Sequence, residues 1–199
     1  MSKFLAPIHH MMYDKILFLD TLTRLVLDLA HNNSVLSIKS KVDILGKIEK
    51  GELEDMIDQS NIHDWLNDRI QVVEKRFAYS VSLLLLEKPE AKDELLSIMH
   101  EVGKDVSSDC SLFETYELIM SKFLDGMPCD RAVEITNKDK DSIRFKFVID
   151  THSKYWDEYE NSEIYWELRE ACISGILENT DYELLKIDDK NYELRSIKC

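Results

Sequence analysis

Residues 132–149 read AVEITNKDKDSIRFKFVI, and this stretch decides the fold class of the chain. Branched and aromatic residues dominate its two ends, and five polar residues, 137–141, lie between them. Two short runs of this composition around a polar turn predict a β-hairpin, with strands at 132–136 and 142–149.

The sequence that follows this hairpin completes an α+β pattern. A second hairpin is predicted from residues 182–187 and 192–197, which flank another polar turn. Between the two hairpins, Asn161-Ser162 is expected to cap a helix that continues to Leu177. The order strand, strand, helix, strand, strand predicts one antiparallel sheet with helices packed on one face.

Helical periodicity dominates the chain before this region, because apolar residues recur every three or four positions. The predicted helices cover residues 8–30, 34–50, 52–58, 61–87, 89–105 and 111–125. We therefore expect a single domain, 1–199, with a helical part at 1–125 and an α+β part at 126–199.

The charge of the chain limits its partners. Among 199 residues, 39 are acidic and 25 are basic, which gives a formal net charge of −14. Nucleic acids and anionic membranes are attracted by basic surfaces, so neither is an expected partner. No apolar run approaches the roughly 18 residues of a membrane span.

The four cysteines form no Cys-x-x-Cys pair, which argues against zinc-ribbon and thioredoxin-type sites. A chain of this length has no need of a disulfide framework, and we expect a soluble, cytoplasmic protein. The usual motifs of nucleotide phosphate loops, dinucleotide folds and zinc proteases are absent. No metal site is predicted, and the sequence leaves any cofactor open.

One internal repeat brings two histidines into equivalent positions. Residues 8–16 align without gaps on residues 62–70, with matching Ile, His, Asp, basic and Ile positions. His9 and His63 would both lie in the first turn of a long helix. Two such imidazoles facing one cavity would suit a haem or other ligand, whereas the alternative is a structural or chance repeat.

Two further segments carry reactive side chains. Cys129 lies just before the first predicted strand and His152 just after the second, so both lie at the same end of one hairpin. A thiol beside an imidazole is the arrangement of a Cys/His-dependent hydrolase or lyase. The alternative for Cys129 is an inert thiol in a turn shaped by Gly126 and Pro128.

Residues 150–159 combine aromatic, histidine and acidic side chains, and the helix that follows adds two more aromatics and an arginine. Aromatic side chains with polar edges suit the wall of a small-molecule pocket, and arginine binds carboxylates in a forked geometry. The alternative is a loop that folds its aromatics onto the sheet as additional core. The candidate ligand-binding residues in this region are His152, Tyr155, Trp156, Tyr165 and Arg169.

The tail from Ala132 to Cys199 resembles the C-terminal part of the fold shared by 4-vinyl reductase domains and vesicle-tethering TRAPP subunits. The stretch at 168–178, LREACISGILE, resembles the helix between the two hairpins of that fold. The resemblance implies binding of small apolar or aromatic molecules, or a role as an adaptor. The cysteine-rich metal motif of 4-vinyl reductases is absent, so no metal site is carried over.

Three functions from different classes follow from these patterns. The first is a small-molecule-binding protein with a pocket between helices and sheet, whose ligand is aromatic or tetrapyrrole-like. The second is a hydrolase or lyase that uses Cys129 with His152. The third is a protein–protein interaction module, and a homodimer is a further expectation.

Overall fold

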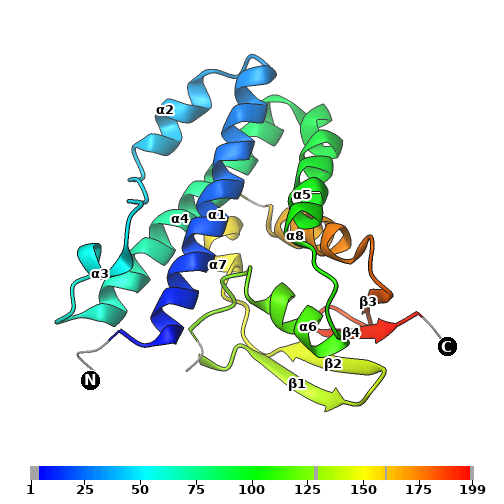
Figure 1. The fold of residues 1–199 in the computed structure, drawn as a ribbon. Helices are drawn as coiled ribbons and strands as arrows, with labels where there is room; N and C mark the ends of the chain where they lie inside the picture. The colour runs from blue at the N-terminus through cyan, green and yellow to red at the C-terminus, as the bar shows by residue number, and fades with distance from the viewer. Residues whose placement is uncertain (1–4, 128–129, 160, 198–199) are drawn as a thin grey trace. The chain divides into compact units, whose positions relative to one another are not determined.

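The computed structural model describes residues 5–127, 130–159 and 161–197 (Figure 1). It confirms the α+β class, because helices pack on a four-stranded antiparallel sheet formed by the C-terminal third. The described residues form two compact units. The helical unit comprises residues 5–92, 122–124 and 155–159, and the sheet unit comprises 93–121, 125–127, 130–154 and 161–197. Residues 93–121 thus group with the sheet, whereas the sequence placed them in the helical part.

The helical unit is built around two long amphipathic helices that pack against each other, as the apolar periodicity predicts. Met12 and Ile16 of the first helix and Leu66 and Val73 of the second are almost completely buried. No helix in the described part of the chain combines the length and apolar character needed to cross a membrane. The elements are α1 (Pro7–Asn32), α2 (Ser37–Asp43), α3 (Leu53–Met56), α4 (Ile62–Glu87) and the 3-10 turn η1 (Pro89–Ala91).

The helix predicted for residues 34–50 is wrong beyond Asp43, where α2 ends. Gly46 has a φ of +109°, a backbone conformation that favours glycine and ends regular helix. The guanidinium of Arg76 donates hydrogen bonds to the carbonyl oxygens of Val42, at 3.1 Å, and of Gly46. These carbonyl oxygens therefore accept hydrogen bonds from a side chain of α4 and not from the backbone N–H groups of a longer α2.

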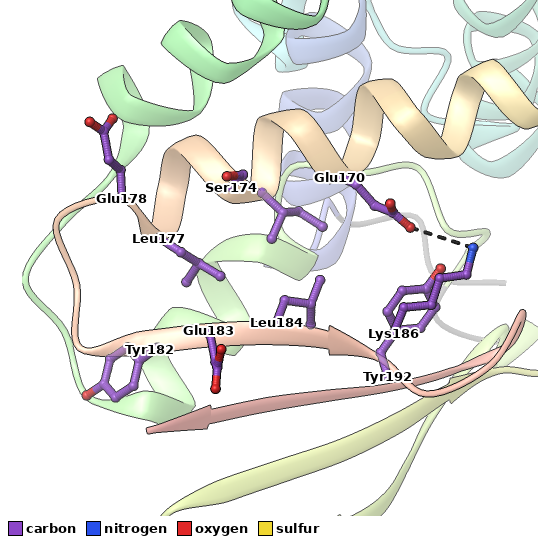
Figure 2. Close-up of a pocket in the computed structure, with 10 residues that line it drawn as sticks. Glu170, Ser174, Leu177, Glu178, Tyr182, Glu183, Leu184, Lys186 and Tyr192 are labelled. Atoms are coloured by element: carbon purple, nitrogen blue, oxygen red, sulfur yellow. Dashed lines mark ion pairs between the residues drawn. The ribbon is translucent and has the colours of Figure 1, made fainter. Parts of the chain in front are cut away.

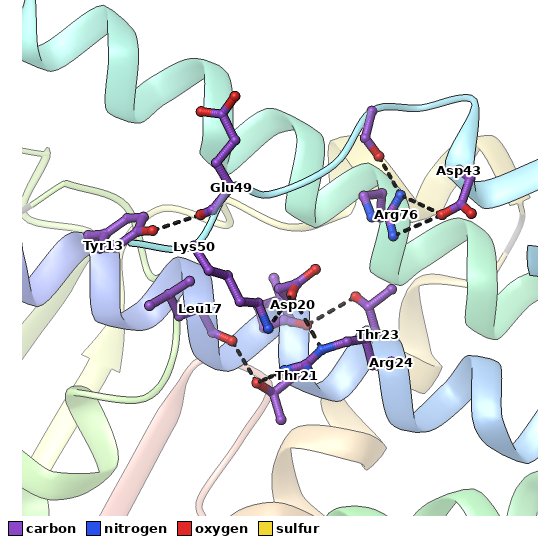
Figure 3. Close-up of polar contacts among 12 residues, drawn as sticks. Tyr13, Leu17, Asp20, Thr21, Thr23, Arg24, Asp43, Glu49, Lys50 and Arg76 are labelled. Atoms are coloured by element: carbon purple, nitrogen blue, oxygen red, sulfur yellow. Dashed lines mark hydrogen bonds and ion pairs between the residues drawn. The ribbon is translucent and has the colours of Figure 1, made fainter. Parts of the chain in front are cut away.

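The segment after α2 is extended and is held against α1 by polar contacts (Figure 3). The Tyr13 hydroxyl donates to the backbone carbonyl of Glu49 at 2.7 Å. The Lys50 ammonium lies 3.4 Å from the buried carboxylate of Asp20, and Arg24 lies 3.5 Å from the same group. The Arg24–Asp20 pair is local, at i and i+4 of α1, whereas the contacts of Glu49 and Lys50 join positions far apart in sequence and no local pattern reveals them.

Two short segments from later in the chain complete the core of the helical unit. The ring of Phe123 meets the ring of Phe18 edge-on, with centroids 6.3 Å apart. Trp156 is fully buried, and its indole meets the ring of Phe77 edge-on at 5.6 Å. Aromatic pairs of this geometry add packing energy to the area that they bury.

The sheet unit has the strand order β1-β2-β4-β3, so β1 and β3 are the edge strands. Both predicted hairpins are confirmed, and β4 of the second pairs with β2 of the first. The predicted loop at 150–159 instead contains a short helix and a 3-10 turn. The elements are α5 (Lys92–Val106), α6 (Leu112–Met120), β1 (Val133–Lys138), β2 (Ser142–Phe147), α7 (Ser153–Trp156), η3 (Asp157–Tyr159), α8 (Ser162–Leu177), β3 (Tyr182–Lys186) and β4 (Asn191–Ser196).

The two faces of the sheet differ in chemistry because side chains alternate along each strand. Ile143, Phe145 and Leu194 are buried on the inner face, which α6 and α8 contact. The outer face instead carries one ion pair across each pair of neighbouring strands. These pairs are Glu134–Lys146 at 3.2 Å, Arg144–Glu193 at 2.9 Å and Glu183–Arg195 at 2.8 Å.

Helices α5 and α8 cross at two glycines with their backbones in direct contact. A Cβ atom on Gly103 would lie 2.0 Å from the carbonyl oxygen of Cys172, and one on Gly175 would lie 1.9 Å from that of His100. Both distances are far shorter than any real contact of a Cβ atom. The crossing therefore requires glycine on both helices.

Candidate functional site

The sheet unit contains a pocket of about 350 Å³ between α8 and β3, which we call the α8–β3 pocket (Figure 2). Its helix wall consists of residues spaced i, i+3, i+4 and i+7, which share one face of a helix. Its strand wall consists mainly of alternate residues of β3, which point to the same side of the sheet. The two walls include Glu170, Ile173, Ser174 and Leu177 on the helix, and Tyr182, Leu184, Lys186 and Tyr192 on the strands.

A second hollow, of about 500 Å³, lies beside this pocket. It is lined by the first half of α8 and by the turn between β3 and β4, including Trp166, Glu167 and Asp189. Glu170 and Lys186 line both hollows, and their charged groups lie 3.8 Å apart. This single ion pair therefore borders both spaces.

Two buried polar atoms in the α8–β3 pocket make no hydrogen bond of good geometry among the described residues: Oη of Tyr192, which interacts with the Glu170 carboxylate, and Oε1 of Glu170, which lies 3.8 Å from the Lys186 ammonium. The Tyr192 side chain is deeply buried, with an exposed fraction of 4%. Burial, together with the nearby negative charge of Glu170, raises the pKa of Tyr192 to about 12. The phenol is therefore neutral at physiological pH.

A buried polar cluster lies at the first half of α8. The rings of His152 and Tyr165 stack with centroids 3.9 Å apart, and the Tyr165 hydroxyl lies 2.7 Å from Nε2 of His152. Arg169 binds the Asp125 carboxylate through two nitrogens, at 2.7 and 2.8 Å. Arg169 also donates to the Tyr165 hydroxyl at 3.3 Å, so the four side chains form one network.

The charges in this network stabilise each other. Burial alone would raise the pKa of Asp125, but the positive charge of Arg169 and the hydrogen bonds from His152 and Arg169 hold it well below its ordinary value. Burial likewise opposes the charge on Arg169, and Asp125 holds the pKa of Arg169 above its ordinary value. Both groups therefore remain ionised in a buried environment.

Local structure places the two members of this cluster that precede α8. Asp125 is followed by Gly126, which has a φ of +77°. The helix predicted for residues 111–125 ends earlier, at Met120, and Gly126 turns the chain directly after Asp125. At His152, the side chain of Asp150 accepts the backbone N–H groups of His152 and Ser153, at 2.9 and 3.0 Å.

The cluster also supports the inner end of the pocket. The Arg169 guanidinium lies 5.0 Å from the centre of the Phe147 ring, in a cation–π contact. Arg169 and Phe147 share a small cavity of about 10 Å³ with Glu170 and Tyr192, which also line the α8–β3 pocket. The cluster thus borders the same interior space as the two polar residues of the pocket.

The candidate ligand-binding residues fall into separate groups in the structure. His152, Tyr165 and Arg169 come together in the buried cluster, as their proximity in sequence suggests. Tyr155 and Trp156 instead belong to the helical unit, are buried there, and line neither hollow of the sheet unit. The short helix α7 accounts for this difference, because both aromatic side chains on it are buried in the core of the helical unit.

His9 and His63 lie side by side in the helical unit, with ring centroids 5.8 Å apart. Nδ1 of His9 accepts the backbone N–H of Ala6 at 2.9 Å, so this nitrogen is engaged at the start of α1. Burial, followed by the charges of His63 and His10, lowers the pKa of His9. Among the described residues, no group of three or more His, Cys, Asp or Glu side chains could hold a metal ion.

Cys129 lies outside the described residues, so the pairing of Cys129 with His152 stays a prediction. On the histidine side, Nε2 is within hydrogen-bonding distance of the Tyr165 hydroxyl and 3.4 Å from Asp125. His152 has an exposed fraction of only 2%.

The pocket residues Glu170, Lys186 and Tyr192 were not predicted from the sequence. A signal for the helix wall was present, because Glu170 and Ser174 interrupt an apolar face of α8 at i and i+4. Lys186 and Tyr192 carried no comparable signal, since their role depends on the pairing of β3 with β4. Asp125 was also missed, because its partner Arg169 is 44 residues away.

Comparison with known proteins adds no further assignment: no protein-family model, curated protein or solved structure matches this chain.

Proposed function

We propose that this protein binds a small molecule, and that the binding site is the α8–β3 pocket. The observation that carries the proposal is a pocket of about 350 Å³ with both apolar and polar walls. Sites for small ligands have volumes of about 300–1,000 Å³ and combine apolar surface with a few polar groups. Ile173, Leu177 and Leu184 supply the apolar surface here, and Glu170 and Tyr192 supply polar atoms.

The resemblance of the C-terminal third to 4-vinyl reductase and TRAPP-like domains favours the same proposal, since it implies binding of small apolar or aromatic molecules. The scarcity of cysteines favours a cytoplasmic location. A Cys/His-dependent reaction, a protein-interaction role and a homodimer stay predictions. The site proposed here differs from the one expected from sequence, because its lining includes none of the candidate residues His9, His63, His152, Tyr155, Trp156, Tyr165 and Arg169.

The proposal is tested by filling the pocket with a side chain. Ser174 is exposed on the helix wall, so Ser174→Trp places an indole at the pocket without disturbing a buried residue (Figure 2). Glu117→Trp, at an exposed position on α6 outside the pocket, is the matched control. Each variant is compared with the wild type in a thermal-shift screen of small amines, alcohols and carboxylates.

We expect some compounds to raise the Tm of the wild type and of Glu117→Trp, but not that of Ser174→Trp. Native mass spectrometry of the same samples should show one bound molecule per chain. Compounds that stabilise all three proteins equally would place binding elsewhere. A screen without any stabilising compound would contradict the proposed function.

A further inference from the structure

We propose that the ligand of the α8–β3 pocket is a protonated primary amine with a compact apolar body, and that its ammonium group takes the place of the Lys186 ammonium beside Glu170. This inference rests on the proposed function and specifies the chemistry of its ligand. It is carried by three properties of the pocket: its charges, its unsatisfied polar atoms and its apolar wall.

The first property is that Glu170 is the carboxylate available to a ligand. The pocket also includes Glu178 and Glu183, but each has a cation outside the pocket. Glu178 lies 3.2 Å from the ammonium of Lys104, and Glu183 lies 2.8 Å from the guanidinium of Arg195. The ion pair of Glu170 is instead made with Lys186, which itself lines the pocket, at 3.8 Å.

The second property is the pair of polar atoms that lack hydrogen bonds. Tyr192 is more than nine-tenths buried, and its hydroxyl makes no hydrogen bond of good geometry among the described residues, although it interacts with the neighbouring Glu170 carboxylate. The buried Oε1 of Glu170 likewise makes no hydrogen bond of good geometry, and its contact with the Lys186 ammonium is long, at 3.8 Å. A buried polar atom without a hydrogen bond destabilises the protein, so a ligand that satisfies both atoms gains that energy on binding.

An ammonium group suits these two atoms better than other ligand groups. It has three N–H donors and no acceptor, so it donates both to the Glu170 carboxylate and to the oxygen of the neutral Tyr192 phenol. A ligand carboxylate would be repelled by Glu170. An alcohol would supply one donor and no charge, so it would leave the carboxylate less well compensated.

Lys186 already shows how a cation occupies this position. Its ammonium approaches Glu170 from the edge strand β3, and its side chain is about half exposed (Figure 2). An ion pair of this length and exposure contributes little stability, about 0–1 kcal/mol. A ligand ammonium can therefore displace Lys186 into solvent at small cost.

The third property is the apolar wall beside this polar end. Figure 2 shows Leu177 of α8 and Leu184 of β3 pointing toward each other across the pocket. Ile173 belongs to the same wall. An amine whose carbon skeleton covers these side chains removes apolar surface from water, which favours a compact aliphatic or aromatic body over a polyamine.

The experiment measures binding of 2-phenylethylamine by isothermal titration calorimetry at pH 7. The comparison ligands 2-phenylethanol and 3-phenylpropanoate present a neutral and an anionic group on a similar skeleton. The variants are Glu170→Gln, Tyr192→Phe and Lys186→Met, with Ser174→Trp as the blocked pocket. Far-UV circular dichroism and thermal unfolding verify that each variant is folded.

We expect the amine to bind the wild type more tightly than the alcohol, and the carboxylate not to bind. Glu170→Gln should weaken amine binding about tenfold to hundredfold, since a hydrogen bond to a charged group contributes about 1.5–3 kcal/mol. Tyr192→Phe should weaken it by less, because it removes a neutral hydrogen bond. Lys186→Met should strengthen it by up to about fivefold, since the competing cation is gone.

The sign of the Lys186→Met effect separates the alternatives. Weaker amine binding in this variant, or tighter binding of 3-phenylpropanoate than of the amine, would overturn the inference. If alcohols or carboxylates bind the wild type but not Ser174→Trp, the pocket is a binding site and only the amine assignment is wrong. If no compound of any class depends on Ser174, the proposed function itself fails.

Discussion

Asp125 lies between α6 and β1, outside any helix or strand, yet its carboxylate receives two hydrogen bonds from Arg169. Both side chains are almost completely buried. Removing two charges from water is costly, and the cost is offset only when the pair is well aligned and further hydrogen bonds are made. Here Tyr165 and His152 supply those additional contacts.

We therefore predict strong coupling between Asp125 and Arg169. Asp125→Leu leaves a buried guanidinium without its counterion and should lower the free energy of unfolding by about 3–5 kcal/mol. Arg169→Met leaves a buried carboxylate without its counterion and should lower the free energy of unfolding by a similar amount. The double variant should lose much less free energy of unfolding than the two single variants lose together, because replacing both members of a buried pair leaves no buried charge. Urea unfolding of the four proteins measures this cycle.

The exposed pair Glu134–Lys146 is the control for this cycle, at an N–O distance of 3.2 Å with both side chains nearly half exposed. Glu134→Gln should change the free energy of unfolding by about 0–1 kcal/mol. Additive losses at Asp125 and Arg169 would mean that the two charges do not stabilise each other.

His9 leads to a prediction about pH. Its pKa in the folded protein is lowered from the ordinary value of 6.5, so the unfolded chain binds a proton more readily. Stability from this group is therefore complete above pH 6.5 and is lost as the pH falls through the folded pKa. His9→Gln keeps a side-chain acceptor for the Ala6 N–H but does not titrate. Its stability relative to the wild type should rise as the pH falls from 7.5 to 5, by at most about 1.4 kcal/mol per pH unit.

Chemical denaturation at several pH values tests this expectation. His31→Gln, which removes an exposed imidazole from the other end of α1, is the matched control. A parallel pH profile for His9→Gln and the wild type would show that protonation of His9 does not affect folding.

At the scale of helices and strands, the close crossing of α5 and α8 depends on two residues, Gly103 and Gly175. Gly103→Ala and Gly175→Ala would each force a methyl group into the backbone of the other helix. Neither contact is relieved by moving a flexible side chain, so the helices must separate. We expect each variant to lose about 1–3 kcal/mol or more of unfolding free energy.

Gly51→Ala provides the matched control for these glycines. A Cβ atom at Gly51 would meet only the flexible end of Met56, with its sulfur at 3.3 Å. This variant should change the free energy of unfolding by no more than about 0.5 kcal/mol, as surface substitutions do. Urea titrations of the three variants make the comparison, and equal stabilities would contradict the tight crossing.

Over the whole molecule, the parts predictable from sequence are those set by local periodicity. The apolar stripes of α1 and α4 predict both helices closely, and the composition of residues 132–149 predicts the first hairpin. The α+β class follows from the order of these elements. The early end of α2 could not be predicted in the same way, because it depends on Arg76 of another helix.

The candidate site could likewise be predicted only where its residues are close in sequence. His152, Tyr165 and Arg169 are close in sequence, and a search for clustered chemistry finds all three. The α8–β3 pocket instead depends on where one edge strand lies beside a helix, which periodicity does not describe. Trp156 shows the converse, because a side chain suited to a binding pocket belongs to the core of the helical unit.

The placement of Trp156 has a consequence for how the chain is made. The helical unit contains most of the first 92 residues, but its core includes Phe123 and Trp156, which are translated much later. As the polypeptide leaves the ribosome, α1 and α4 can pair while the surface around Phe77 still lacks its indole. The first part of the protein to emerge therefore waits for the β1–β2 hairpin to be synthesised before its own core can close.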